Sequence, residues 1–353
     1  MKKLIYLFQL QLFAEAGTLT NTTTGHVNAY TGAATTTDAM SVEMKVYYDT
    51  DVLDNAREKM IFGQLGKKQT LPANHGKTVE FRKFDTLPDA EKLQEAVIPE
   101  GKKLGTTSIN VAVDQYGLYV AVSDQLDLHA IDPVILHATE EVGYSGGLTY
   151  EKLIISVLKT GANVLYADAL DGDGNFVSTP ATRAELAAAN DYVAYLTPRM
   201  INKAKTILKK SNAPAFSGDK YVAVIHPSVA EDLRNSHGWM EAHQYAAPEE
   251  IFNGEIGELH GVRFIESNLA PIVKQDGVAV YLTMFFGKDA FCVIDPEGAG
   301  METIIKPKEV AGGPLNQFST IGAKFEMGAG ILYPERMLTL ESLSSYSDLD
   351  EAN

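Results

Sequence analysis

Apolar side chains recur with two different periods along the chain. Over residues 46–65 they return every three to four positions, with Val52 and Met60 on one face, which predicts a mostly helical segment. Over residues 77–84 and 107–123 apolar and polar residues alternate instead, as in strands with one exposed face. The pattern therefore predicts an α+β chain in which two extended stretches are joined by residues 85–106.

The connection over residues 85–106 is much longer than the usual hairpin loop of about two to five residues. Its charged residues, together with Pro88, Pro99 and Gly101, suit an arm that projects into solvent. A loop without fixed structure explains the same composition, and the residues alone do not separate the two interpretations.

Residues 133–164 form the longest helical pattern, with Ile135, Val142 and Val157 spaced to share one face. At about 1.5 Å per residue, such a helix would be roughly 40 Å long. The sequence GYSGG at 143–147 weakens it, since each glycine costs up to about 1 kcal/mol relative to alanine. We therefore expect a bend or a break at this point.

A second α+β region follows. DGDGN at 171–175 is a turn sequence, and Thr197 followed by Pro198 predicts the start of a helix. Apolar runs that predict strands, separated by short helices and glycine-rich turns, occur at residues 221–227, 261–267, 278–286 and 290–295. A last extended section at 321–341 leads to a polar, acidic tail.

The overall composition is that of an ordinary folded protein. The chain has 353 residues, 45% of them hydrophobic, and a formal net charge of −16, which argues against a surface built to grip phosphates over a broad area. No apolar run reaches the roughly 18 residues of a membrane helix. Cys292 is the only cysteine, so an intrachain disulfide is excluded, and its apolar neighbours predict that it is buried.

The first residues, MKKLIYLFQLQLFAEAG, have the layout of a secretory signal peptide, with two lysines, an apolar run and an Ala-Glu-Ala sequence. Gln9 and Gln11 interrupt the apolar run, and the polar residues 17–37 suit an extended segment laid over another surface. A cleaved signal and a retained structural arm both remain open at this point.

Several motifs that suggest chemistry lack the required context. Ser145 lies in a G-x-S-x-G sequence, but this motif needs a strand before it and a helix after it, and here it falls inside a helical pattern. HGKT at 75–78 resembles the end of a phosphate-binding loop, yet Leu71 occupies the position that requires glycine. Lys209 and Lys210 are explained by a helix C-terminus.

No metal or cofactor site is predicted. Asp171, Asp173 and Asn175 begin like a calcium loop, but Phe176 replaces the required glycine. Thr182 then stands where the loop needs glutamate. His237 and His243 are six residues apart, too far around a helix to share a metal. We therefore assign no catalytic residue, no cofactor and no metal ligand.

Four stretches carry a resemblance to a known family: FQLQLFAE (8–15), LTYEKLIISVLKTGANVLYAD (148–168), IGELHGVRFIES (256–267) and IGAKFEMGAGILYPERMLTLES (321–342). In this order they resemble the major capsid protein of tailed bacteriophages, in the branch related to the N-four-like phages. The resemblance implies the Hong Kong 97-type fold, an α+β architecture with an N-terminal arm, an extended β-hairpin loop, a long spine helix, a peripheral domain and an axial domain.

The resemblance also implies a division of the chain. Residues 1–50 correspond to the N-terminal arm, 51–167 to the first part of the peripheral domain, 168–305 to the axial domain, and 306–353 to the return of the peripheral domain and the tail. Within the second region, residues 77–123 correspond to the extended loop, which in the family lies over an adjacent subunit, and residues 133–164 to the spine helix.

Exposed apolar residues on such extensions are candidates for contacts between subunits. They are Leu10, Leu12 and Phe13 on the arm, and Leu87, Leu93, Val97 and Ile98 on the loop. Local packing within the same chain is the alternative for each. Some relatives crosslink through a loop lysine; Lys92, Lys102 and Lys103 lie on the corresponding loop, and we assign no crosslink to them.

The resemblance implies a structural protein, not an enzyme, that self-assembles into hexameric and pentameric capsomers of an icosahedral head around double-stranded DNA, which it encloses without sequence-specific binding. Implied partners are a scaffolding protein and a portal, with decoration proteins as further candidates and no membrane. The protein would be assembled in the host cytoplasm and reside in the virion. Within this interpretation the first seventeen residues are an arm segment. Alternatives are an encapsulin-like bacterial compartment and a secreted hydrolase using Ser145.

Overall fold

The structure is a computed structural model and divides into two units, residues 1–55 and 56–353. In the first unit a short antiparallel pair is described, β1 (His26–Val27) and β2 (Ala34–Thr35). The signal-like segment and most of the predicted helix at 46–65 lie outside the described residues. The described residues are 26–27, 34–35, 60–72, 76–85, 87–90, 92, 100–129, 134–171, 175–188, 194–216, 218–236, 239, 255–298, 300–311, 315–347 and 349–353.

The second unit contains a long five-stranded sheet built around one strand, β17 (Phe318–Ile331). β6 (Asp114–Ser123) and β16 (Glu302–Lys306) both pair with residues 320–324 of β17, so they lie on its opposite edges. β15 (Phe291–Pro296) pairs with the far end of β17, and β3 (Lys67–Leu71) pairs with β15.

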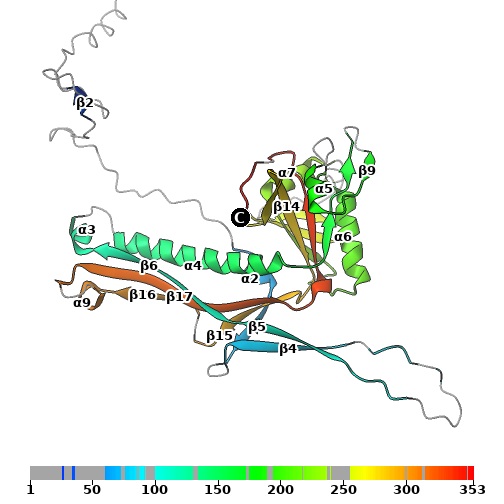
Figure 1. Cartoon of the computed structure of the whole chain (residues 1–353), viewed down its shortest axis with the longest axis horizontal. Helices are drawn as coiled ribbons and strands as arrows, with labels where there is room; N and C mark the ends of the chain where they lie inside the picture. Colours follow the sequence, from blue (N-terminus) through cyan, green and yellow to red (C-terminus); the bar gives the residue numbers. More distant parts are fainter. Residues whose placement is uncertain are drawn as a thin grey trace, which may run out of the picture. The chain divides into compact units, whose positions relative to one another are not determined.

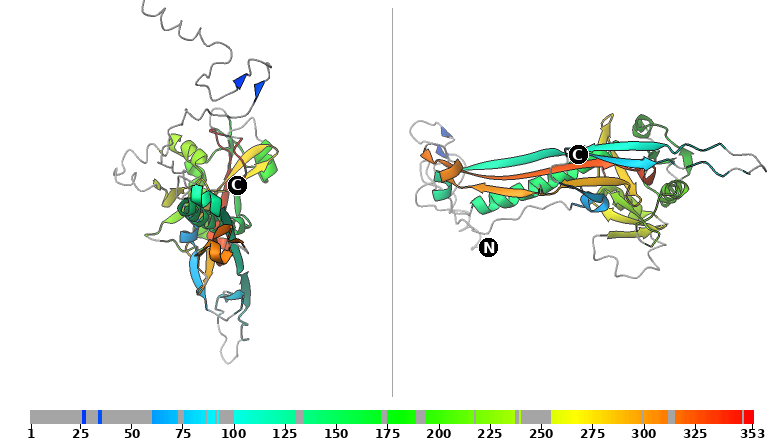
Figure 2. Two further views of the ribbon diagram at one scale, coloured as in Figure 1. Left: turned by 90° about the vertical axis from the view of Figure 1, so that its left-hand side faces the viewer. Right: turned by 90° about the horizontal axis from the view of Figure 1, so that it is seen from below.

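Helix α4 (Val134–Leu158) runs along β6 and β17 and covers one face of this sheet (Figures 1 and 2). Its Val142 packs against Ile321 and Ala323 of β17. The expected break at 143–147 is wrong, because the helix is continuous through these residues. A Cβ on Gly146 would lie 2.8 Å from Met301 Cε, and one on Gly147 would lie 2.6 Å from Met60 Cε. The glycines therefore allow close packing and do not end the helix.

A second sheet has seven strands in the order β11–β12–β10–β14–β18–β7, with β13 also paired to β14. Its central strand β14 is buried along nearly its whole length and matches the predicted run at 278–286. The strands are β7 (Val164–Tyr166), β10 (Tyr221–Ile225), β11 (Glu255–Leu259), β12 (Val262–Glu266), β13 (Ile272–Gln275), β14 (Val278–Phe286) and β18 (Met337–Ser342).

Helices on both faces bury β14. On one face, Tyr281 and Phe285 pack in a cluster with α6 (Pro198–Lys210) and α7 (Pro227–Asn235). On the other face, Val280 and Leu282 pack with Leu186 of α5 (Arg183–Ala188). The predicted helix start is confirmed, since Thr197 is the N-cap of α6 and Pro198 its first residue. A continuous apolar run is the expected signature of a strand buried on both faces.

The chain crosses between the two sheets twice near its end. It leaves the seven-stranded sheet after β14, builds β15, β16 and β17 of the long sheet, and returns through the turn η3 (Pro334–Arg336) to β18. A domain boundary at residue 305 therefore does not separate the two sheets, because β15 before it and β16 across it belong to the long sheet and β18 after it belongs to the seven-stranded sheet. The remaining described elements are α3 (Asp124–His129), β8 (Ala169–Leu170), β9 (Phe176–Ser178) and α9 (Lys308–Ala311).

Among the described helices, none is both long and apolar enough to span a bilayer.

A short helix, α2 (Phe62–Leu65), is attached to α4 through a buried carboxylate. Glu151 of α4 is 2% exposed and accepts the N–H groups of Phe62 (3.0 Å) and Gly63 (3.1 Å). These are amides of the first turn of α2, which have no partner within the helix. Burial raises the pKa of Glu151, and the two N–H donors offset part of that rise. The carboxylate thus connects the chain preceding β3 to the long helix.

Replacing Glu151 should destabilise the subunit. In Glu151→Ala two buried N–H groups lose their acceptor, and we expect a loss of about 1–3 kcal/mol in the free energy of unfolding. Glu151→Gln keeps one acceptor oxygen and should lose less. Denaturant unfolding of unassembled subunits measures both, and equal stability of Glu151→Ala and the wild type would contradict this account of α2.

The residues after β18 are bound to the seven-stranded sheet by polar contacts. Asp350 accepts hydrogen bonds from the Tyr281 hydroxyl (2.6 Å) and the Ser347 hydroxyl (2.7 Å). The side chain of Asn353 accepts the Ile272 N–H at 2.9 Å. The hydrogen bonds from Tyr281 and Ser347 lower the pKa of Asp350 below its ordinary value. The acidic tail predicted from the sequence is therefore a docked segment.

This docking should weaken in acid. Because the pKa of Asp350 is depressed in the folded state, its contribution is present above the unfolded value of about 4 and is lost as the pH falls through the folded value. We expect the Ile272 amide to lose hydrogen-exchange protection over that range in the wild type, and already at neutral pH in Asp350→Asn. Glu351→Gln is the matched control: this 93% exposed carboxylate forms an ion pair with Lys274 of β13 (3.2 Å) that water screens strongly, so the Ile272 amide should keep its protection in this variant.

The extended hairpin as candidate assembly site

β4 (Thr78–Phe84) and β5 (Thr106–Ala112) form an antiparallel hairpin that is a sheet of its own. The ladder runs from Thr78 opposite Ala112 to Phe84 opposite Thr106. β5 continues through Val113 into β6, so the hairpin is an extension of an edge strand of the long sheet (Figure 1). A two-stranded hairpin is at best marginally stable by itself, so its attachment to the body decides where it points.

The base of the hairpin rests on an apolar cluster. Val111 is buried among Cys292, Ile294 and Leu332 of the long sheet and its continuation. Val79, Phe81 and Ile109, which alternate with exposed residues along their strands, pack on the same cluster. The prediction that Cys292 is buried is confirmed, and burial raises the pKa of its thiol to about 11, so the thiol stays protonated.

Beyond Phe84 the hairpin exposes apolar side chains. The Asp85 N–H donates to Gly105 O (3.0 Å), and the Thr107 hydroxyl donates to the Asp85 carboxylate (3.3 Å), which closes the described ladder. Phe84 is 63% exposed, and Leu87 and Leu104 are each 51% exposed. Of the seven predicted contact residues, Leu87 is described and exposed. Leu10, Leu12, Phe13, Leu93, Val97 and Ile98 lie outside the described residues.

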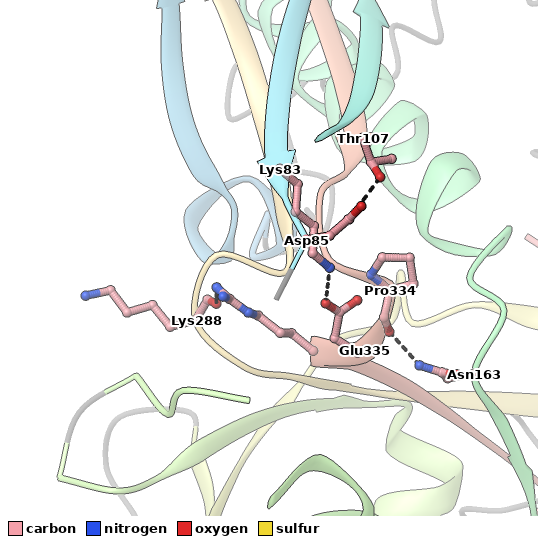
Figure 3. Close-up of polar contacts among 8 residues, drawn as sticks. Lys83, Asp85, Thr107, Asn163, Lys288, Pro334 and Glu335 are labelled. Carbon is pink, nitrogen blue, oxygen red and sulfur yellow. Dashed lines mark hydrogen bonds and ion pairs between the residues drawn. The ribbon is translucent and has the colours of Figure 1, made fainter. Parts of the chain in front are cut away.

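A polar group lies at the point where the apolar base ends. Lys83 of β4 forms an ion pair with Glu335 of η3 (Figure 3). The Lys83 ammonium also lies 5.0 Å from the ring centroid of Tyr333, and the Arg336 guanidinium lies 3.7 Å from the same centroid. Burial alone would raise the pKa of Glu335, but the hydrogen bond from Lys83 and the charges of Lys83 and Arg336 lower it overall.

Sequence reasoning did not find this polar group. Lys83 and Glu335 are 252 residues apart, and neither stands out from its neighbours in the sequence. The ion pair between the partly exposed Arg183 and the buried Glu341 (2.7 Å and 2.5 Å) was also missed. Its only sequence signal is a glutamate inside the apolar run of β18, where every residue is buried.

A second set of exposed apolar side chains lies at the end of the long sheet that is opposite to the hairpin, where Phe318 pairs with Ser123. This end is formed by the last residue of β6, the first residue of β17 and the adjacent helices α3 and α9. Neither α3 nor α9 has a buried residue. The exposed side chains are Leu126, Leu128, Leu136, Val310, Leu315 and Phe318. Such groups are typical of surfaces that contact another protein.

The enzyme candidates are not assembled into a site. Ser145 lies in the middle of α4, where its carbonyl oxygen accepts the Thr149 hydroxyl at 2.8 Å, so the strand-to-helix turn of a hydrolase is missing at this serine. Asp171, directly after β8, accepts the Asn175 N–H at 2.7 Å, and Asp173 lies outside the described residues. His237 and His243 lie outside the described residues.

The fold and these surfaces define a class of self-assembling structural protein. Its features are a hairpin anchored at its base, apolar side chains exposed on this hairpin and at the opposite end of the long sheet, and a seven-stranded sheet with helices on both faces. The chain belongs to the family described as phage capsid protein, whose model matches residues 106–337. It is thus a major capsid protein that forms a head shell and is located in the virion. A comparison with curated proteins finds no match.

Solved structures share the fold. The capsid of cyanophage P-SCSP1u is 16% identical, with a TM-score of 0.62, and the match covers 86% of this chain and 94% of that one. For the capsid of Ralstonia phage GP4 the identity is 14%, the TM-score 0.60 and the coverage 88% and 97%. The head of Helicobacter pylori bacteriophage KHP40 is 11% identical, with a TM-score of 0.65, and the match covers 86% of this chain and 96% of that one. The expected Hong Kong 97-type α+β fold is confirmed.

The apolar cluster beneath the hairpin, which contains Val111, Cys292, Ile294 and Leu332, is called the apolar seat below. Truncating one of its side chains should lower the stability of the subunit. Leu332 is 5% exposed and packs in the cluster beneath the hairpin, so Leu332→Ala should lose about 2–5 kcal/mol in the free energy of unfolding. Leu104→Ala, at an exposed position beyond the seat, should stay within about 0.5 kcal/mol of the wild type. Denaturant unfolding of both variants checks the difference, and similar losses would contradict the assignment of the seat.

Proposed function

We propose that the protein assembles into hexameric and pentameric capsomers of an icosahedral shell that encloses double-stranded DNA. The observation that carries this is the hairpin, which is anchored at its base and exposes Phe84, Leu87 and Leu104 at its outer part. Apolar groups on such an extension gain by burial against another copy. Closed symmetric assembly is the usual outcome when identical chains contact each other in this way.

Within this proposal, each part of the chain has a role. Residues 1–50 form the N-terminal arm, 77–123 the extended loop and 133–164 the spine helix. Within these bounds the projecting hairpin is limited to β4 and β5, since residues 114–123 form β6 of the long sheet, and the helix is limited to α4, since Val164 belongs to β7. Residues 168–305 form the axial domain, and 306–353 the return of the peripheral domain and the tail. Membership of the sheets refines this division: β15 and β16 belong with the peripheral sheet, and β18 with the axial one.

The proposed contact residues are Leu87, Leu93, Val97 and Ile98 on the loop and Leu10, Leu12 and Phe13 on the arm. The exposure of Leu87 supports the loop assignment. The chain would enclose DNA without sequence-specific binding and without a catalytic step, in line with its net charge of −16. A scaffolding protein, a portal and decoration proteins would be its partners, and assembly would take place in the host cytoplasm. A match to phage capsids favours this over an encapsulin-like compartment.

Assembly of purified protein tests the proposal. We expect the wild type to form uniform shells or capsomer rings in negative-stain micrographs. Leu87→Asp places a charge on the proposed contact surface and should abolish the shells, while its free energy of unfolding stays within about 0.5 kcal/mol. Leu87→Met keeps an apolar side chain and should assemble.

Two results would contradict the proposal. A wild type that stays monomeric at high concentration would overturn assembly itself, and normal shells of Leu87→Asp would exclude Leu87 as a contact residue. Shells isolated from cells that hold a protein cargo in place of DNA would favour the encapsulin-like alternative.

A further inference from the structure

The direction of the hairpin depends on its inner face. Along β4 the residues on this face are Val79, Phe81 and Lys83, which are partly buried, and those on the opposite face are exposed. Val79 and Phe81 rest on the apolar seat. Lys83 comes next on the same face, at the point where the seat ends, and reaches Glu335 instead of solvent. The ion pair is thus the outermost described contact from the inner face of β4 to the body.

The acceptor of this ion pair is fixed in place. Glu335 belongs to the turn η3, and two neighbouring segments, at Asn163 and at Gly287 with Lys288, bind this turn. Asn163 Nδ2 donates to Pro334 O at 2.6 Å (Figure 3). Arg336 Nη1 donates to Lys288 O at 3.2 Å. The Gly287 N–H donates to Arg336 O at 2.8 Å. The turn links β17 of the long sheet to β18 of the seven-stranded sheet, so Lys83 contacts the body where the two sheets meet.

The charges around the turn favour the contact between Lys83 and Glu335. The Arg336 guanidinium stacks 3.7 Å from the centroid of Tyr333, and the Lys83 ammonium lies 5.0 Å from the same centroid. Two cations beside one ring repel each other, and the Glu335 carboxylate offsets that repulsion. The side chains of Lys83 and Glu335 are 36% and 39% exposed, so water screens their attraction only in part.

We propose that Lys83 and Glu335 are positioning residues for assembly: their ion pair fixes the direction in which the extended hairpin leaves the body. The hairpin then presents its outer apolar residues in one orientation before it meets another subunit. The part of this inference that concerns assembly rests on the proposed function, whereas the fixed direction of the hairpin does not.

The direction of the hairpin can be measured in unassembled subunits. Spin labels on Ser108→Cys of β5 and Lys210→Cys of α6 report the distance between hairpin and body, and Cys292 is fully buried and will not react. We expect a narrow distance distribution in the wild type and in Lys83→Arg, and a broad one in Lys83→Met and Lys83→Glu. The double variant Lys83→Glu with Glu335→Lys should recover the narrow distribution.

Arg82→Glu is the matched control, because Arg82 is the neighbouring cation on the exposed face and pairs with Glu80 of its own strand. It should leave the distribution unchanged. All these variants should melt within about 4 °C of the wild type, because a partly exposed ion pair contributes little to global stability. A narrow distribution in Lys83→Met, or a broadening in Arg82→Glu equal to that in Lys83→Met, would overturn the proposal.

Assembly of the same variants separates this inference from the proposed function. If Lys83→Met broadens the distribution and also loses shells, and the double variant recovers both, the pair positions the loop for assembly. If the distribution broadens while shells form normally, the assembly half of the inference is wrong and the fixed direction stands. A wild type without shells but with a narrow distribution would refute the proposed function alone.

Discussion

The contact between Phe286 and Phe291 joins the two sheets, and much of the second unit depends on it. Phe286 ends β14 of one sheet and Phe291 begins β15 of the other, and their ring centroids are 5.4 Å apart. Ile154 and Leu158 at the end of α4 pack in the same cluster, and the ring of Phe62 meets Phe286 edge-on at 6.3 Å. The long helix, the segment before β3 and both sheets therefore share one apolar core.

Local patterns predicted the elements that this core contains, but not how they join. The run at 278–286 is a strand because a central strand covered by helices on both faces needs apolar residues throughout. The break expected at GYSGG did not occur, because packing against Met60 and Met301 outweighs the low helix propensity of glycine. Glu151 could have been found: with Ile154, Ile155 and Leu158 it falls on the buried stripe of α4, where an unpaired charge would be costly.

The candidate site was less predictable than the fold. The length and composition of the connection at 85–106 allowed either a projecting arm or a loop without fixed structure, and Leu87 within it is exposed. The residues that anchor the hairpin come from a distant part of the chain. Leu332 and Glu335 both follow β4 by about 250 residues, and the separation between Lys83 and Glu335 is 252. No periodicity within one segment carries such information, since it depends on β17 and β18 returning the chain to the hairpin.

A fixed hairpin also has a thermodynamic consequence for a shell. Full burial of a large apolar side chain contributes about 1.5–3 kcal/mol, and Leu87, which is 51% exposed, can still offer about half of this once per subunit. Association must first offset the lost freedom of both partners, and ordering a mobile loop adds to that cost. A loop whose direction is already set by Lys83 and Glu335 has less freedom to lose. The partly exposed ion pair therefore matters more for association than for the folding of the single chain, because folding rests mainly on the apolar core.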